Sequence, residues 1–232
     1  MPLLIVTGLA YEARLIAGPD LVTICSGGSP ERLRHKLRRH PRAYRAVVSF
    51  GIAGGLDPSL SPGDVVLAQG IVDGKARWLS HPGLTQDWAQ RLSVKGRNVV
   101  EAEIAGVEAT VRTPVAKAAL RSATGAAAVD MESHVAAEFA AVCGVPFAAI
   151  RVICDAANHS LPPFVGDALD ADGILDWQYI LRGVVRQPIQ IALLARLALA
   201  SSAALAGLRH CRPLLGPNLE VGNLAKPFSD VS

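Results

Sequence analysis

Apolar residues along this chain gather in short runs, and most runs end near a glycine, a serine or an acidic residue. Runs of this length that are rich in Val, Ile and Leu predict buried β-strands. They are Leu3 to Thr7, Leu21 to Cys25, Ala46 to Phe50, Val65 to Ala68, Val99 to Ile104, Val107 to Val111 and Phe147 to Ile153. Apolar positions three or four residues apart predict helices over residues 31–39, 85–92, 114–120 and 131–143, with a short helix at Glu12. Strands that alternate with helices are typical of an α/β domain.

One stretch, residues 126–158, reads as a strand, a helix and a second strand. Its first strand is predicted over Ala126 to Val129, and Asp130 then occupies the position expected for a helix N-cap. Glu132 lies just inside the predicted helix, and Asp155 lies just past the second strand. In an open α/β sheet, ligands bind outside the carboxyl ends of the strands. We therefore expect these two carboxylates to converge on one crevice.

Two glycine-rich segments follow predicted strands. Gly51 to Gly55 allows the backbone to approach a ligand closely, although its spacing is not that of the dinucleotide-binding G-x-G-x-x-G motif. Gly27 and Gly28 precede Ser29 and Pro30, residue types that mark the start of a helix. The N–H groups at such a start can hold an anion. The plainer alternative, which we favour for this segment taken alone, is an ordinary turn between a strand and a helix.

The helix predicted over residues 31–39 is strongly basic. Its cationic residues are Arg32, Arg34, Lys36, Arg38 and Arg39. They form either a solvated helix face or a surface that attracts an anionic membrane or phosphate. Because the formal net charge of the chain is only +3, we favour the solvated face and expect no nucleic-acid partner.

Length and composition suit one compact domain with a large aliphatic core. The chain has 232 residues, of which 50% are hydrophobic and 19% are charged. We assign residues 1–210 to a single domain and residues 211–232, which are rich in Pro, Gly and Asn, to a C-terminal tail. The four cysteines lack the spacing of metal ligands, which predicts reduced thiols and no metal site.

The apolar stretch over residues 189–208 raises the question of a membrane span. It contains Arg196 and several polar residues, so we expect a long buried or interface helix, preceded by a shorter helix over residues 174–185. The N-terminus has no basic segment ahead of its apolar run, so no signal peptide is expected. These features together predict a cytoplasmic protein.

Three segments in order resemble the nucleoside phosphorylase and nucleosidase superfamily, which includes purine nucleoside phosphorylases and methylthioadenosine/adenosylhomocysteine nucleosidases. They are GLAYEARL at residues 8–15, VSFGIAGGLDPSLSPGDVVLA at residues 48–68, and residues 126–158. The resemblance covers roughly residues 1–160. It implies a three-layer α/β/α fold with a central mixed β-sheet, of the phosphorylase/hydrolase-like type, a homo-oligomer, and an enzyme that cleaves the N-glycosidic bond of a purine nucleoside, most naturally an adenine nucleoside.

Within that superfamily the chain looks most like the hopanoid-associated phosphorylase branch. The residues that carry this finer resemblance are Gly8-Leu9, Glu12-Ala13-Arg14, Val129 to His134, Arg151 to Ile153 and Leu161-Pro162-Pro163. The branch implies release of adenine from adenosylhopane, a lipid nucleoside, with inorganic phosphate as a possible co-substrate, no other cofactor, and possible peripheral contact with the inner membrane face. A hydrolytic nucleosidase and a non-catalytic nucleoside-binding protein remain as alternatives.

The resemblance also assigns roles to individual residues. Asp155 matches the acid that protonates the purine N7, and Glu132 matches the residue that binds the ribose 2′ and 3′ hydroxyls. Met131 is expected to pack under the sugar, and Glu12 matches the position that orients the attacking water in the nucleosidases. The residues expected to line the sugar are Gly8, Ile52, Ala53 and Gly54, and the candidates for phosphate contacts are Arg14, Gly28 and Arg32.

The chemistry explains why such a site needs two acids. Breaking the bond between ribose and purine leaves an oxocarbenium-like sugar and a purine anion, and neither forms easily in water. A general acid at N7 accelerates such a step by about 10²–10⁴-fold, and burial after an apolar strand would raise the pKa of Asp155 toward the required range. An ionised Glu132 would hold the hydroxyls and place negative charge beside the developing cation.

The sequence departs from the family pattern at the base-binding side. Ile52 stands where many relatives have Ser, Cys154 where nucleosidases have Ser, and Asn158 where they often have Asp. Residues 106–113 contain no Phe, although relatives stack an aromatic side chain on the base there. These departures leave the contacts to the base open and do not affect the two acids.

Overall fold

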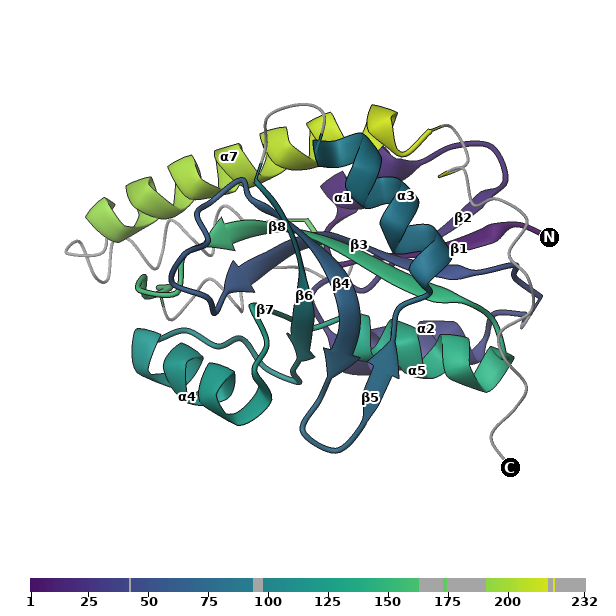
Figure 1. Cartoon of the computed structure of the whole chain (residues 1–232), viewed down its shortest axis with the longest axis horizontal. Helices are drawn as coiled ribbons and strands as arrows, with labels where there is room; N and C mark the ends of the chain where they lie inside the picture. Colours follow the sequence, from purple (N-terminus) through teal and green to yellow (C-terminus); the bar gives the residue numbers. More distant parts are fainter. Residues whose placement is uncertain (42, 94–97, 163–172, 175–190, 217–218, 220–232) are drawn as a thin grey trace.

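The computed structural model describes residues 1–41, 43–93, 98–162, 173–174, 191–216 and 219. Its strands are β1 (Leu3–Thr7), β2 (Leu21–Cys25), β3 (Val47–Gly55), β4 (Val65–Val72), β5 (Arg77–Leu79), β6 (Val99–Gly106), β7 (Ala128–Asp130) and β8 (Phe147–Asp155). Its helices are α1 (Ala10–Ile16), α2 (Pro30–Arg38), α3 (Pro82–Ser93), α4 (Pro114–Thr124), α5 (Ser133–Cys143) and α7 (Ile191–Leu214). Figure 1 shows these helices on both sides of a central sheet.

The sheet is mixed, and part of it closes on itself. The strand order is β2-β1-β3-β7-β6-β4-β5, and β8 pairs with both β3 and β4. The strands β3, β7, β6, β4 and β8 therefore form a ring. Within the ring, β3 is parallel to β8 and antiparallel to β7, whereas β4 is parallel to β6 and antiparallel to β8. The resemblance predicted such a three-layer fold with a mixed sheet, and this prediction is confirmed.

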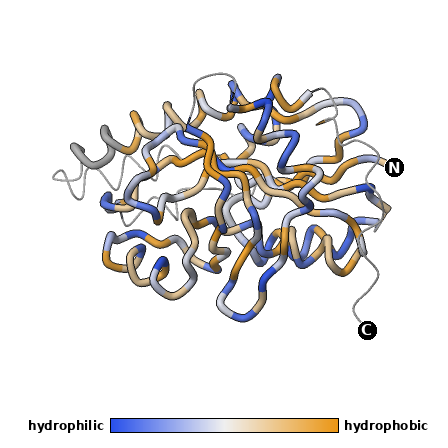
Figure 2. The backbone as a smooth tube through the Cα atoms, viewed as in Figure 1, coloured by the Kyte–Doolittle hydropathy of each residue, from blue (hydrophilic) through white to orange (hydrophobic). Residues whose placement is uncertain are grey.

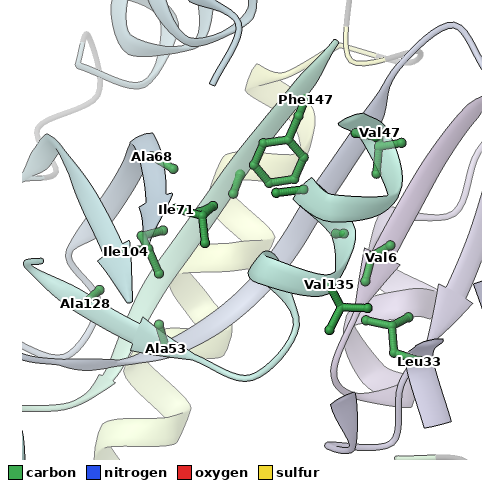
Figure 3. Close-up of a cluster of buried hydrophobic side chains, with 14 of the residues drawn as sticks. Val6, Leu33, Val47, Ala53, Ala68, Ile71, Ile104, Ala128, Val135 and Phe147 are labelled. Atoms are coloured by element: carbon green, nitrogen blue, oxygen red, sulfur yellow. The ribbon is translucent and has the colours of Figure 1, made fainter. Parts of the chain in front are cut away.

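Each face of the sheet has its own hydrophobic core. On one face, Leu33 of α2 and Val135 of α5 pack with Val6 and Val47 from the strands, as Figure 3 shows. On the other face, Ile16 of α1, Trp88 of α3 and Leu208 of α7 pack together with strand residues. Figure 2 shows the central strands as the most hydrophobic part of the chain. Burial of each side chain of this size stabilises the fold by about 1.5–3 kcal/mol. The two cores together therefore fix the positions of the strands, including the ends of the strands.

Local sequence signals set several helix ends. The Ser29 hydroxyl accepts a hydrogen bond from the backbone N–H of Arg32 at 3.2 Å, and Pro30 follows as the first residue of α2. The same arrangement begins α4, where the Thr113 hydroxyl caps the helix. Gly144 ends α5 in the left-handed conformation, with φ at 64°. The prediction of a helix start after Gly27-Gly28 is thus confirmed.

The stretch from residue 126 to 158 folds as strand, helix and strand, with shifted boundaries. The first strand is β7, which runs to Asp130, and the N-cap of α5 is Glu132 instead of Asp130. The reason is electrostatic, because the buried carboxylate of Asp130 pairs with Arg151. It also accepts a hydrogen bond from the backbone N–H of Ser133 at 3.2 Å, so it still satisfies one donor at the start of the helix.

Two other predictions were wrong, and one lies outside the described residues. Residues 107–111 form a loop instead of a strand, because their apolar side chains face a pocket and not a neighbouring strand. The tail was expected from residue 211, yet α7 continues through Leu214, and the Trp88 indole N–H donates to the Leu219 carbonyl at 3.1 Å. The helix predicted over residues 174–185 falls almost wholly outside the described part of the chain.

The question of a membrane span can be answered for the described residues. None of the helices there has both the length and the apolar character needed to cross a bilayer. The apolar stretch near residue 200 instead belongs to α7, and Ala204 and Leu208 of that helix are buried in the core.

Candidate active site

A pocket with a volume of about 180 Å³ lies where several strands end. Five strands deliver residues to it just at or after their carboxyl ends, namely β1, β3, β6, β7 and β8. The residues that line the pocket are Gly8, Leu9, Glu12, Gly28, Ile52, Ala53, Gly54, Val107, Thr110, Val111, Val129, Asp130, Met131, Glu132, Cys154, Asp155 and Leu161. The structure thus brings Glu12, Glu132 and Asp155 to one crevice, as expected for the ends of strands in an α/β sheet.

A hydrogen bond from Ser26, which follows β2, holds the Glu132 side chain at the N-terminus of α5. The hydroxyl of Ser26 donates to Glu132 Oε1 at 2.8 Å. Gly8 lies against the carboxylate so closely that a Cβ there would be 3.1 Å from Oε1. Burial is the main cause that raises the pKa of Glu132 to about 7, and the charge of Asp130 adds to it, while Arg151 opposes it. Near neutral pH this carboxyl therefore exists in both protonation states.

Glu12 ties the turn after β1 to the middle of β3. Its Oε2 accepts the backbone N–H groups of Gly8 and Leu9 at 2.8 and 2.9 Å, and its Oε1 accepts that of Ile52 at 2.8 Å. Only glycine fits at position 51, because a Cβ there would lie 2.7 Å from Oε1. Burial raises the pKa of Glu12, and the charge of Arg151 works against this increase. Both carboxylate oxygens are thus occupied by the backbone while the side chain lines the pocket.

Asp155 is buried at the end of β8 beside a lysine that the sequence did not reveal. The ammonium group of Lys117, from α4, forms an ion pair with Asp155 Oδ2. One signal was available, because Lys117 lies on the same face of α4 as Pro114 and Leu120, which are partly buried. A lysine at an inward-facing helix position needs a buried partner, and Asp155 is that partner.

A second buried ion pair lies behind the pocket. Arg151 Nε donates to Asp130 Oδ2 at 2.5 Å, and Arg151 also donates to the hydroxyl of Ser49 at 2.6 Å. The hydroxyl of Ser133 donates to the same Asp130 oxygen at 2.5 Å. This network joins β3, β7, α5 and β8, so it fixes the relative positions of the strand ends that carry the acids.

Buried acidic side chains outnumber buried cationic ones in the described part of the chain. Among the described residues, the buried acids are Glu12, Asp130, Glu132 and Asp155, and the buried cations are Lys117 and Arg151. Two acids thus lack a cationic partner, and they are the two whose pKa is raised by burial, Glu12 and Glu132. A cationic sugar would supply the missing positive charge, whereas an additional anion would add to the repulsion.

The structure does not bring the two arginines proposed for phosphate to the pocket. Arg14 is exposed on α1, and the Arg32 guanidinium donates to the Gly27 carbonyl at 3.0 Å. Gly28 does line the pocket, but its N–H lies 2.9 Å from the Ser26 hydroxyl oxygen. None of the lining residues in the described part of the chain is a lysine or an arginine.

The loop after β6 covers one side of the pocket and is fastened at Glu108. Arg34 of α2 forms an ion pair with Glu108, and His134 Nε2 lies 3.0 Å from Glu108 Oε1. The hydrogen bond from Arg34 is the main cause that lowers the pKa of Glu108 to about 2. From the same loop, the hydroxyl of Thr110 contacts the sulfur of Met131 at 3.5 Å. The loop therefore places Val107, Thr110 and Val111 over the pocket.

Comparison with solved structures finds this fold among the 5′-methylthioadenosine/S-adenosylhomocysteine nucleosidases. The enzyme from Neisseria meningitidis, in complex with methylthio-immucillin-A, is 17% identical, with a TM-score of 0.63 over 90% of this chain and 98% of that one. The enzyme from Campylobacter jejuni is 15% identical, with a TM-score of 0.63 over 91% and 99%. A Helicobacter pylori variant with 5′-methylthioadenosine in its active site is 16% identical, with a TM-score of 0.63 over 80% and 98%.

The family follows from a sequence comparison. The model of the phosphorylase superfamily matches residues 35–170, which is more than half of the chain. The chain belongs to the phosphorylase superfamily. The prediction of an enzyme that cleaves the glycosidic bond of a nucleoside is thereby confirmed at the level of the superfamily. No curated protein sequence matches the chain.

Proposed function

We propose that this enzyme releases adenine from an adenine nucleoside by cleaving the N-glycosidic bond. The observation that carries the proposal is the meeting of Asp155 and Glu132 in one pocket that holds a surplus of buried acids. Asp155 acts at the purine N7, and Glu132 binds the ribose hydroxyls. Met131 and the β3 segment Ile52 to Gly54 contact the sugar, together with Gly8. The 5′-methylthioadenosine bound to the Helicobacter pylori relative supports adenine as the base.

The surplus of negative charge supports this chemistry. As the C1′–N9 bond breaks, positive charge develops on the sugar, and carboxylates fixed beside it stabilise the transition state. The hydrogen bond from Ser26 holds the Glu132 carboxylate in place, so little reorganisation energy is needed when the positive charge develops. An active site built for an anionic sugar derivative would instead need cations, which the lining residues in the described ranges do not supply.

Water is the acceptor that the site favours. The two arginines expected to hold phosphate do not line the pocket, and Glu12 would repel a phosphate dianion. Glu12 is fixed by three backbone N–H groups, in the position proposed to orient a water molecule. Phosphorolysis, the reaction implied by the branch that the sequence resembles, is the second candidate. The observation that supports phosphorolysis is that Gly28, one of the candidates for phosphate contacts, lines the pocket.

We propose adenosylhopane as the substrate to test first, because the residues that resemble the hopanoid-associated branch include several that line the pocket. Leu9, Val107, Val111 and Leu161 give the pocket wall an apolar character that suits a hydrocarbon at the 5′ position. The segment from Leu161 to Val185 is dense in apolar residues and is our candidate for further apolar surface at the 5′ side, and it lies mostly outside the described residues. Three basic side chains of α2 have partners within the same chain, which weakens the case for a membrane-binding helix. Arg32 donates to the Gly27 carbonyl, Arg34 pairs with Glu108, and Lys36 donates to the Cys25 carbonyl.

A product assay tests the proposal. The purified protein is incubated with adenosylhopane or with 5′-methylthioadenosine, with and without phosphate, and the products are resolved. We expect adenine from both incubations, a free ribose product, and rates that do not depend on phosphate. A rate that saturates with phosphate and yields a ribose 1-phosphate product would establish phosphorolysis instead. Absence of adenine release from every nucleoside would support the non-catalytic alternative.

A further inference from the structure

Lys117 places a buried ammonium group directly beside the proposed general acid. Its side chain is 1% exposed, and the group comes from α4, an element that contributes no residue to the pocket lining. Besides the ion pair with Asp155, the ammonium donates to the Ala156 carbonyl at 2.7 Å and to the His159 carbonyl at 3.2 Å. All three donors of a lysine are therefore used, one by the last residue of β8 and two by the segment that follows it.

The second oxygen of Asp155 also accepts a hydrogen bond. The thiol of Cys154 lies 3.1 Å from Asp155 Oδ1. Burial is the main cause that raises the pKa of Cys154 well above its usual value, and the charge of Asp155 raises it further, so the thiol keeps its proton and donates. With donors at both oxygens, Asp155 is arranged as an ionised carboxylate. An ionised carboxylate has no proton of its own to give to a purine.

We propose that Lys117 is a positioning residue that stores the proton which Asp155 delivers to the leaving base. This inference rests on the proposed function. When the C1′–N9 bond breaks, its electron pair goes to the base, and N7 takes a proton from Asp155. Asp155 is supplied from the Lys117 ammonium, which becomes a neutral amine. The water that adds to C1′ releases one proton, and that proton restores the ammonium, so no other reactant is needed.

Lysine is suited to this task and arginine is not. An ammonium group can transfer its proton to a hydrogen-bonded carboxylate, whereas a guanidinium is not deprotonated in proteins. The ion pair also keeps the proton within hydrogen-bond reach of the carboxylate while the site is empty. Lys117→Arg should therefore preserve the charge but not the supply of protons, and Lys117→Met should remove both.

Leaving-group dependence separates proton supply from a merely structural role. The substrates are 5′-methylthioadenosine, whose base must be protonated to leave, and 4-nitrophenyl riboside, whose leaving group departs without an acid. For Lys117→Met and Lys117→Arg we expect at least a roughly 10²-fold lower rate on the nucleoside, the scale of one general acid, and a rate within a few-fold of the parent on the riboside. Equal losses on both substrates would overturn the proposal. Lys75→Met, at an exposed lysine, is the matched control and should change neither rate.

A double-mutant comparison keeps the test decisive if the single variants fold poorly. Lys117→Met combined with Asp155→Asn leaves no unpaired charge in the interior. If Lys117 acts only through Asp155, this double variant should cleave 5′-methylthioadenosine at the rate of Asp155→Asn alone. A further loss of more than a few-fold would contradict the proposal. A parent enzyme that cleaves neither substrate would refute the proposed function itself, which is a different outcome.

Discussion

Ser26 and Glu132 are joined at the pocket by a hydrogen bond of 2.8 Å, although 106 residues separate them in the sequence. The contact joins the segment after β2 to the N-cap of α5 across the strands β1 and β3. It fixes one oxygen of the carboxylate proposed to bind ribose. The orientation of Glu132 is therefore set before a substrate arrives, and its contribution to binding can be tested by a change that preserves its shape.

Glu132→Gln should lower kcat/KM for ribosides more than it lowers kcat/KM for 2′-deoxyribosides. The substitution removes the charge that strengthens the hydrogen bonds to the sugar, and such a bond contributes about 1.5–3 kcal/mol, or roughly a 10–100-fold change in kcat/KM. A 2′-deoxy substrate already lacks one partner, so it should lose less. The measurement is kcat/KM for both substrates in parent and variant, with Glu31→Gln at an exposed position of α2 as the control. Equal losses would refute direct contact with the 2′ hydroxyl.

Glu132 should also make the stability of the protein depend on pH. Its pKa is raised from 4.5 to about 7 in the folded state, so the folded protein binds this proton more tightly than the unfolded chain does. The free energy of unfolding should then fall as the pH rises between these values, by at most about 3–4 kcal/mol at 1.36 kcal/mol per unit. The Glu132→Gln variant has no carboxyl group at this position, so its free energy of unfolding should not fall in this way. Thermal unfolding should show the variant gaining stability over the parent from about pH 5 to about pH 8, and a constant difference would contradict the pKa shift.

Asp155→Asn should reduce turnover by at least about 10²-fold, because an amide cannot deliver a proton to the base. The amide oxygen can still accept the hydrogen bond from Lys117, but the ammonium loses its counter-charge, so the variant should be less stable than the parent and its folding is checked by thermal unfolding. Adenine release under saturating substrate is the measurement. Asp87→Asn, at an exposed position of α3, is the matched control and should behave like the parent. Turnover of the Asp155 variant within a few-fold of the parent would exclude its role.

Arg151→Met should destabilise the fold strongly. Removal of one partner from a buried ion pair leaves the other charge uncompensated and costs about 3–5 kcal/mol, which corresponds to a Tm lower by roughly 10 °C for a chain of this size. The double variant Arg151→Met with Asp130→Asn should recover part of this loss, because no unpaired charge remains. Thermal unfolding of parent, single and double variants measures the effect, and Arg38→Met at an exposed position is the control. A double variant less stable than the single one would show that the pair is not the cause.

The sequence could predict the acids of the site because they follow strands whose apolar character is local. Asp155 comes at the end of one predicted buried strand, Glu132 follows a second by a few residues, and the carboxyl ends of neighbouring strands meet at one edge. Lys117 and Arg151 could not be found as partners in this way. Each pairs with an acid from a different element, Lys117 with Asp155 and Arg151 with Asp130, and only the packing of α4 and β8 brings them together.

The prediction of a strand over residues 107–111 was wrong for a related reason. Val107 and Val111 have the composition of a strand, but their side chains are partly buried against a pocket and the loop is fastened through Glu108 to α2 and α5. Apolar residues that face a ligand site cannot be told from those that face a neighbouring strand by spacing alone. Arg14 and Arg32 were proposed for phosphate contacts from their charge, and the structure does not place either residue among those that line the pocket.

The closed ring of strands makes the order of synthesis matter for folding. β8 is the last strand among the described residues, and it pairs on one side with β3 and on the other with β4. A chain still emerging from the ribosome and ending before Phe147 has the other four strands of the ring but lacks the strand that closes it. Its exposed edges of β3 and β4 are templates for pairing with other chains. Completion of β8 removes both of these edges, and it is the same event that delivers Asp155 to the pocket.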